Sequence, residues 1–204
     1  MPIPLSWHLY LPQNLHASVT AQISSFLDYH GVSTPSFAAA YFRSIHYHFP
    51  ILSPQRCFIM LERSAQVHRA DIYLLMLALY LLTCLPDPDM RALRPSTLAG
   101  YALGKSSLGL LEATASRSVE ALQASTLMTL FEVGHGMGEQ ACVSVIAASK
   151  AGMLLKKGTM SMEMQEDVKA ACCGIETLDR WAIPSPFAPS LAYYSKGFSV
   201  LTIF

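Results

Sequence analysis

The sequence predicts an all-α protein, a single domain of helices packed around a central antiparallel helical hairpin. Hydrophobic residues make up 52% of the 204 residues and charged residues only 14%, which is typical of a chain that buries a core. Residues 118–157 contain two long apolar segments joined by a glycine-rich turn. Elsewhere, apolar residues recur every three or four positions, which is the spacing of one helix face.

The predicted hairpin begins with a helix over residues 118–134. Ser118 can act as its N-cap, and Gly134 can end it because glycine accepts a positive φ. A helix that is apolar on every side must be covered on every side. The helix carries apolar residues around its whole circumference: Val119, Leu122, Leu127, Met128, Leu130, Phe131 and Val133.

The second hairpin helix, residues 139–155, is rich in small side chains, which let another helix approach closely. These residues are Ala141, Cys142, Ala147, Ala148, Ala151 and Gly152.

Residues 1–36 form a predicted N-terminal segment with one amphipathic helix. Residues 1–14 hold three prolines and are predicted to be irregular, and Asn14 can cap the helix that follows. This helix ends at Gly31, and its apolar stripe consists of Val19, Ile23, Phe26 and Leu27.

The next elements are a turn and cap at residues 33–36 and a helix over residues 37–47. Pro50 and Pro54 then predict an extended crossing at residues 49–53. Residues 58–82 are predicted to form two helices with a break near residues 68–71.

A surface loop at residues 84–95 follows these two helices. The next predicted helix, residues 97–115, is interrupted at Gly104 and Gly109.

After the hairpin, residues 158–164 predict a loop. A helix ending near Trp181 then carries the stripe Val168, Ala171, Cys172, Ile175 and Leu178. The main domain is predicted to span residues 37–189. Residues 190–204 form a tail whose apolar, β-prone end suggests truncation.

The charge and the cysteines argue against several classes of protein. Lys and Arg number 14, Asp and Glu number 14, and no basic stripe is present, so we expect no direct nucleic-acid contact. Five cysteines at unrelated spacings favour free thiols in a reducing compartment. The longest apolar run, residues 72–82, is shorter than the ~20 residues of a membrane span, so we expect no membrane association.

No pattern of catalytic, metal-binding or cofactor-binding residues is recognisable. Gly134, Gly136 and Gly138 resemble a dinucleotide-binding turn, but Glu139 stands where the next glycine belongs. The seven histidines lack the spacing of a helical metal site, and the adjacent Cys172 and Cys173 cannot chelate one ion together. Asp179 and Arg180 are expected to form a local cap and ion pair, with Asp179 nearly buried.

Four stretches of the chain, in order, resemble the fungal-specific transcription factor domain, the middle homology region of zinc-cluster regulators. The first, residues 41–52, is similar to an opening element written YF..IH..FPIL through Tyr41, Phe42, His46, Phe49 and Pro50. The second, residues 118–131, is similar to the first core helix of the family and includes Leu122.

The other two stretches follow in the family's order. Gly134 and Gly136 lie in a segment that resembles the turn before the second core helix, and Leu178, Asp179 and Arg180 resemble an LDR motif. The chain departs from the family where a Trp-Trp pair is usual, since Cys172 and Cys173 stand there. The preceding basic residues are reduced to Lys169, and the usual Gly-Arg-Pro after LDR is replaced by residues 183–187.

The resemblance implies an all-helical regulatory region in the nucleus that is not an enzyme. Such a region would control transcription through a small-molecule effector, intramolecular contacts, other regulator chains or the transcription machinery. The family's six-cysteine cluster, which holds two zinc ions and contacts DNA, has no counterpart in these residues, so we expect no cofactor.

Two alternatives stay open. The first is a helical interaction module that pairs with a partner regulator. The second is a helical domain with a small-molecule or catalytic pocket. A polar residue deep between helices would favour the pocket, and the sequence alone identifies none.

Overall fold

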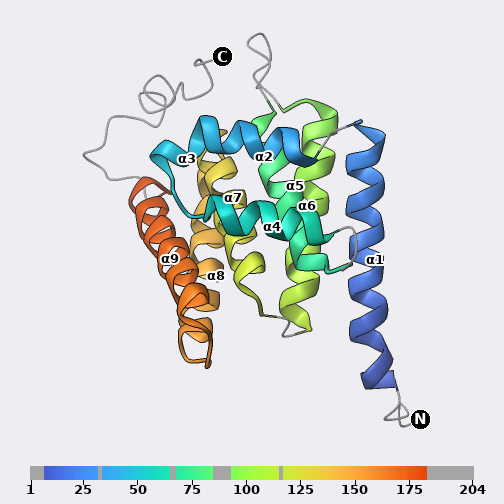
Figure 1. Cartoon of the computed structure of the whole chain (residues 1–204). Coiled ribbons are helices and arrows are strands. Elements are labelled where there is room, and N and C mark those ends of the chain that lie inside the picture. Colours follow the sequence, from blue (N-terminus) through green and yellow to red (C-terminus); the bar gives the residue numbers. More distant parts are fainter. Residues whose placement is uncertain (1–6, 32–33, 65–67, 85–92, 115–116, 183–204) are drawn as a thin grey trace.

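The computed structural model describes residues 7–31, 34–64, 68–84, 93–114 and 117–182, which contain helices and no strand (Figure 1). The all-α prediction is therefore confirmed for the described residues. The helices are α1 (Trp7–Tyr29), α2 (Thr34–Arg43), α3 (Ile45–His48), α4 (Pro54–Ser64), α5 (Ala70–Thr83), α6 (Pro95–Ala113), α7 (Val119–Gly134), α8 (Gly138–Lys156) and α9 (Met162–Ala182).

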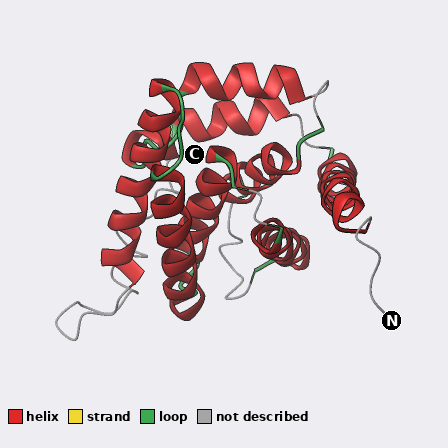
Figure 2. Cartoon of the chain, turned by 90° about the horizontal axis from the view of Figure 1, so that it is seen from below, coloured by secondary structure: helices red, strands yellow, loops and turns green. Residues whose placement is uncertain are grey.

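The helices are arranged around α5 and α7, which pack against each other. Helices α8 and α9 lie on one side of this pair, and α1 and α6 lie on the other (Figure 1). Helices α2 and α4 run crosswise to the rest and form a layer over one face, as the view from below shows (Figure 2). The predicted helical hairpin of α7 and α8 is present, but only α7 is central.

Helix α7 is covered on every side, as its all-round apolar pattern predicts. Every residue from Leu122 to Glu132 is buried. Three of its buried polar side chains donate hydrogen bonds to backbone carbonyls inside the protein. Thr126 and Thr129 donate hydrogen bonds to carbonyls one turn earlier, at 2.8 and 2.9 Å, and Gln123 Nε2 donates to the Ile51 carbonyl at 3.2 Å.

Helix α8 buries one side only, and small residues bring that side close to α9. A Cβ atom on Gly152 would lie 2.9 Å from Cys172 Sγ, nearer than side chains normally pack. The opposite side leaves three large apolar residues exposed: Val143 at 68%, Ile146 at 70% and Met153 at 60%.

The turn between α7 and α8 confirms one predicted cap and corrects another. Ser118 Oγ accepts a hydrogen bond from the Ala121 amide at 3.0 Å, as expected of an N-cap. The residue with positive φ is Gly136, at 71°, and not Gly134, which still belongs to the helix. The amides of Gly136 and Met137 bond back to α7 carbonyls in a Schellman motif, which requires the left-handed residue at position 136.

Two helix starts differ from the prediction, and only at the second does the tolerance of proline at a helix start explain the difference. Helix α1 begins at Trp7, so Asn14 lies inside it instead of capping it. Helix α4 begins at Pro54, a position that tolerates proline because its amide would have no helical partner. Helix α5 begins at Ala70, and the described residues His68 and Arg69 before it are not helical, which agrees with the break predicted near residues 68–71.

Other helix boundaries in the structure also differ from the predicted ones. The predicted helix 37–47 is divided at Ser44, a turn residue between α2 and α3 whose hydroxyl donates to the Ala40 carbonyl at 2.7 Å. Helix α6 is continuous through Gly104 and Gly109. A Cβ on Gly104 would lie 2.8 Å from Met128 Cε, so this glycine serves close packing against α7. Helix α9 begins at Met162, inside the predicted loop.

The described residues also include all five cysteines, and each is a free thiol, as predicted. The predicted tail at 190–204, the end of the 37–189 domain and most of the loop at 84–95 lie outside the described residues.

Two helical glycines provide a test of this packing. At Gly174 on α9, an added Cβ would lie 2.7 Å from Ile51 Cγ2 and 2.9 Å from Phe49 Cζ, whereas at Gly109 it would meet nothing within 4 Å. We expect Gly174→Ala to lower the free energy of unfolding by about 1–3 kcal/mol through overpacking. We expect Gly109→Ala to raise it by about 0.5–1 kcal/mol through helix propensity. Urea denaturation of both variants measures the two effects, and equal shifts of the same sign would contradict the packing of residues 49–52 on α9.

Candidate functional site

The residues of the first family-like stretch form one aromatic cluster at the junction of α2, α3 and the crossing that follows. Tyr41 is fully buried, and its hydroxyl donates a hydrogen bond to the Phe49 carbonyl at 2.9 Å. The ring centroids of Phe42 and His46 lie 5.0 Å apart, and both rings contact Tyr41. Burial raises the pKa of the Tyr41 hydroxyl, which matches its role as a hydrogen-bond donor within the core.

The crossing at residues 49–52 brings this cluster against α7 and α9. Phe49 lies 6.5 Å from Trp181, measured between ring centroids, and Ile51 accepts the hydrogen bond from Gln123. Pro50 is exposed between these two buried residues. The family-like stretches around residues 45 and 180, far apart in the sequence, therefore lie side by side in the fold.

The remaining residues of the resemblance divide between core and surface. Leu122 and Leu178 are buried in α7 and α9, while Gly134 and Gly136 lie at the exposed turn before α8. Asp179 and Arg180 are both exposed, so the expected burial of Asp179 is wrong. The stripe that places Leu178 inward turns its two successors outward.

His46 is the one residue of the aromatic cluster with an unpaired polar atom. Its Nδ1 is buried and has no hydrogen-bond partner among the described residues. Burial lowers the pKa of this imidazole, which favours the uncharged ring against Phe42.

Glu132, a fully buried acid near the end of α7, is not among the residues that the sequence patterns predicted to be important. Its Oε1 accepts hydrogen bonds from the Tyr101 hydroxyl at 2.7 Å and from Lys105 Nζ at 3.0 Å. Lys105 also donates to Ser144 Oγ at 2.7 Å, so this polar network joins α6, α7 and α8. The sequence feature that could have revealed this network is the acid Glu132 within an otherwise apolar run. A charged side chain must be paired when its helix is covered on every side.

The network is stabilised by opposite charges in a water-poor environment. Burial, together with the Glu132 carboxylate, raises the pKa of the Tyr101 hydroxyl and keeps it a hydrogen-bond donor. The second carboxylate oxygen, Oε2, has no hydrogen-bond partner in the described part of the chain. The core thus contains a paired charge with one unsatisfied acceptor.

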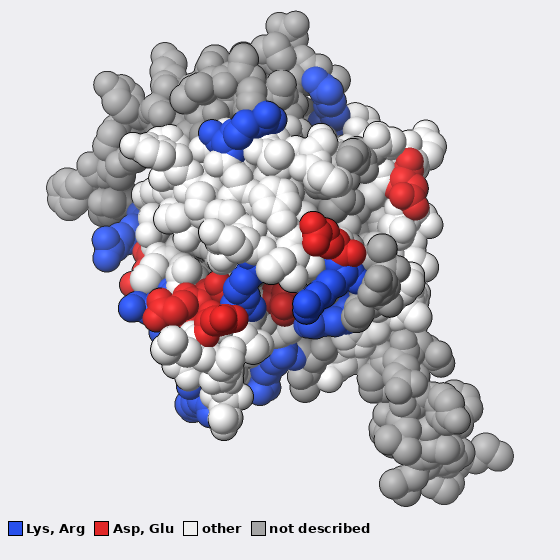
Figure 3. Space-filling view, viewed as in Figure 1, with Lys and Arg blue, Asp and Glu red and all other residues white. Residues whose placement is uncertain are grey.

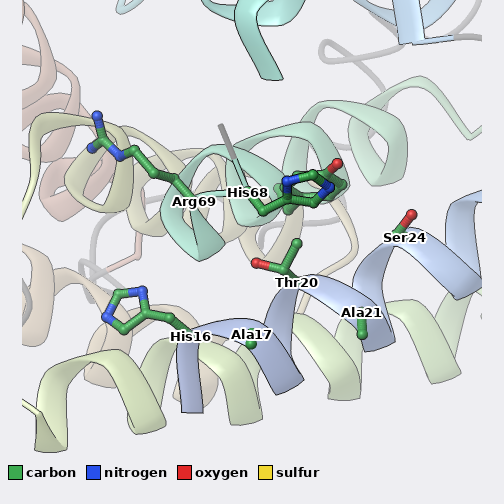
Figure 4. Close-up of a pocket in the computed structure, with 8 residues that line it drawn as sticks. His16, Ala17, Thr20, Ala21, Ser24, His68 and Arg69 are labelled. Atoms are coloured by element: carbon green, nitrogen blue, oxygen red, sulfur yellow. The ribbon is translucent and has the colours of Figure 1, made fainter. Parts of the chain in front are cut away.

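A groove between α1 and the start of α5 is the candidate ligand site (Figure 4). Its volume is about 600 Å³, within the range of small-molecule sites. Helix α1 contributes one wall, and His68, Arg69 and Tyr73 contribute the other. The residues from α1 are His16, Ala17, Thr20, Ala21 and Ser24.

Thr20 is the polar residue in this groove that the sequence did not reveal. It is only 4% exposed, and its Oγ1 has no hydrogen-bond partner among the described residues. Figure 4 shows its side chain directed from α1 toward the opposite wall. The helical period that placed Val19 and Ile23 in the core also carries Thr20 to the edge of that core.

Arg69 is held in place at the opposite wall by two acids. Its Nε donates to Asp71 Oδ1 at 3.1 Å, and one of its terminal nitrogens contacts both Asp71 and Glu120, the latter at 3.2 Å. The hydrogen bonds to Asp71 are the main reason that the pKa of this guanidinium is raised. Asp71 also accepts a hydrogen bond from the Ile72 amide in the first turn of α5.

Charges elsewhere on the described surface are mixed. On the face shown in Figure 3, acidic and basic side chains alternate in a band, and the described part of that face has no broad basic area. Arg56 pairs with Asp167 across α4 and α9, although burial outweighs this pairing and raises the pKa of the Asp167 carboxyl. The described part of this face therefore shows no basic area of the kind that contacts a phosphate backbone.

The described residues contain no group of three or more His, Cys, Asp or Glu side chains placed to hold a metal ion. None of their helices combines the length and the apolar character that crossing a bilayer would require.

Comparison with known proteins finds a similarity to a transcription factor. Over 137 residues the chain is 28% identical to transcription factor BOA15 of Botryotinia fuckeliana, and the match covers 67% of this chain and 72% of that protein. The name of that relative describes a transcription factor and not an enzyme. No family model matches the chain, and no solved structure matches it. The chain is thus an all-α protein similar to a fungal transcription factor.

The Glu132 network predicts a large loss of stability when the carboxylate is removed. Glu132→Ala leaves the Tyr101 hydroxyl without its acceptor and opens a cavity, so we expect the free energy of unfolding to fall by about 3 kcal/mol. Glu132→Gln keeps an acceptor for Tyr101 and should cost only about 1 kcal/mol. Glu112→Ala, on the exposed face of α6, is the control and should change stability by less than about 0.5 kcal/mol. Urea denaturation curves in which Glu132→Ala behaves like Glu112→Ala would contradict the network.

Proposed function

We propose that the chain is the regulatory domain of a fungal transcription regulator and that it acts in the nucleus without contacting DNA itself. The observation that carries this proposal is the 28% identity to transcription factor BOA15 over two-thirds of the chain. The domain controls transcription by binding an effector or by contacting other regulator chains and the transcription machinery. It requires no cofactor and catalyses no reaction.

Two structural features support this proposal. The family-like residues Tyr41, Phe49 and Leu178 are buried in one helical body, as expected of residues that maintain a fold rather than a reaction site. The formal net charge is zero, which disfavours a direct contact with the phosphate backbone.

A reporter assay tests the proposal. The whole chain is fused to a heterologous DNA-binding domain in a filamentous fungus, and transcription is measured from a promoter that carries the matching sites. We expect at least a two-fold change, up or down, relative to the DNA-binding domain alone, because a regulatory domain acts wherever it is tethered. Gly174→Ala should weaken this change in proportion to its loss of folded protein, whereas Gly109→Ala should not. A folded, nuclear fusion that leaves transcription unchanged would argue against a regulatory role.

The exposed side of α8 favours a second candidate function, that of an interaction module. Val143, Ile146 and Met153 lie on one face of this helix, and each is at least 60% exposed. Large apolar residues gathered on one face of a helix are typical of a surface that pairs with another helix. In this alternative the chain acts by pairing with a helical partner regulator, and a second copy of the chain is the first partner to test.

Light scattering tests this alternative. If the α8 face pairs two copies, the molar mass should rise above the 22.3 kDa of one chain as the concentration increases. Ile146→Lys should lower that association at least ten-fold, because it places a charge in the apolar contact. Lys150→Ala, between the apolar residues in the sequence but also exposed, serves as a matched control and should not weaken it. A mass of one chain at every concentration would leave self-pairing without support.

A further inference from the structure

We propose that the groove between α1 and α5 binds an uncharged small molecule that carries a planar ring and a hydroxyl or amide group. The inference deepens the proposed function, on which its regulatory meaning rests, because such a molecule would be the effector of the domain. The binding itself depends only on residues of the groove. It can therefore be tested on the purified chain, apart from any effect on transcription.

The hydroxyl of Thr20 has no hydrogen-bond partner among the described residues. Threonine inside a helix usually donates to the carbonyl four residues earlier, as Thr126 and Thr129 do in α7. Thr20 does not, although its Oγ1 is buried, and a buried hydroxyl without a partner destabilises the protein. In the described structure Oγ1 has almost no solvent-accessible surface. If the Thr20 side chain rotates so that its hydroxyl enters the groove, a hydroxyl or amide group of a ligand would give Oγ1 the hydrogen bond that it lacks.

The charges around the groove favour a neutral ligand over an anion or a cation. Among the described residues that line the groove, Arg69 alone has a permanent charge, and its guanidinium is already paired with Asp71 and Glu120. An anion would have to compete with these two carboxylates for the guanidinium. A cation would have to reach Asp71, which is only 4% exposed behind Arg69. Both would lose hydration without gaining a free partner of opposite charge.

The shape of the groove accounts for the planar ring. The rings of His68 and Tyr73 are stacked, with centroids 6.5 Å apart and an interplanar angle of 13°, so they present flat faces of the same orientation. On the α1 side of the groove, Ala17 and Ala21 are exposed, and their short side chains leave space for a ligand. An aromatic ring can therefore lie against the ring pair, where stacking is favourable, while its polar substituent reaches Thr20.

A matched set of one-ring probes tests this assignment. Benzamide and benzyl alcohol are the neutral probes, benzoate is the anion and benzylamine is the cation. Each is titrated at millimolar concentration against the whole chain, and the ¹³C-labelled methyl signals of Ala17, Thr20 and Ala21 are followed by NMR. We expect the neutral probes to shift these signals and to bind at least ten-fold more tightly than benzoate and benzylamine.

Two variants locate the binding. Thr20→Val keeps the side-chain shape and removes only the unpaired hydroxyl, so it should fold at least as stably as the original chain and bind benzamide about five- to ten-fold more weakly. Ala21→Phe fills the open groove from an exposed position and should abolish binding. Thr126→Val, which removes a buried hydroxyl in α7, and Val143→Phe, which enlarges an exposed residue on α8, are the matched controls and should leave the affinity unchanged.

Three results would overturn the proposal: no methyl shift with either neutral probe, tighter binding of a charged probe, or equal affinity of Thr20→Val and the original chain. A groove that binds benzamide as predicted, in a chain that is inactive in the reporter assay, would retain the ligand site and reject the regulatory function. The opposite pair of results would retain the function and remove this groove as its effector site.

Discussion

The burial of α7 from Leu122 to Glu132 is the constraint on which the rest of the structure depends. A helix that no water reaches must satisfy its own polar side chains and be covered by neighbours on every side. Its Gln123 consequently bonds to the crossing at residues 49–52, and its Glu132 bonds to Tyr101 and Lys105 of α6. The positions of the surrounding helices are coupled to this helix through specific hydrogen bonds as well as through apolar contact.

The charge of Glu132 is a costly way to hold helices together. An apolar residue of similar size would avoid the loss of hydration, and buried ion pairs often add little net stability. What the network adds is directional contact: Lys105 has to lie between Glu132 of α7 and Ser144 of α8. Since α6 also packs against α1, one helix contacts both the wall of the ligand groove and this network.

The resemblance to a fungal regulatory domain has a physical basis in the fold. Four of the eleven residues that carry it are buried, and three of these make contacts across the core: Tyr41 bonds to the crossing, Phe49 contacts Trp181, and Leu178 faces the core. Positions of this kind are constrained by packing, so they can remain similar between proteins that respond to different signals. The groove residues Thr20, His68 and Arg69 lie outside the quoted motifs, where a sequence can change the ligand without changing the fold.

The sequence by itself determined the helical class, the burial of α7, the Ser118 cap and the free cysteines, because apolar period, capping and cysteine spacing are local properties. It missed the break at Ser44 and the helix start at Pro54, since a serine can bond to its own helix and a proline can begin one. Only the tertiary structure decided that Gly104 and Gly174 serve close packing and that Glu132 is paired. It also revealed that Thr20 is unpaired beside a groove, because that groove is formed by residues about 50 positions apart, whose meeting no local pattern encodes.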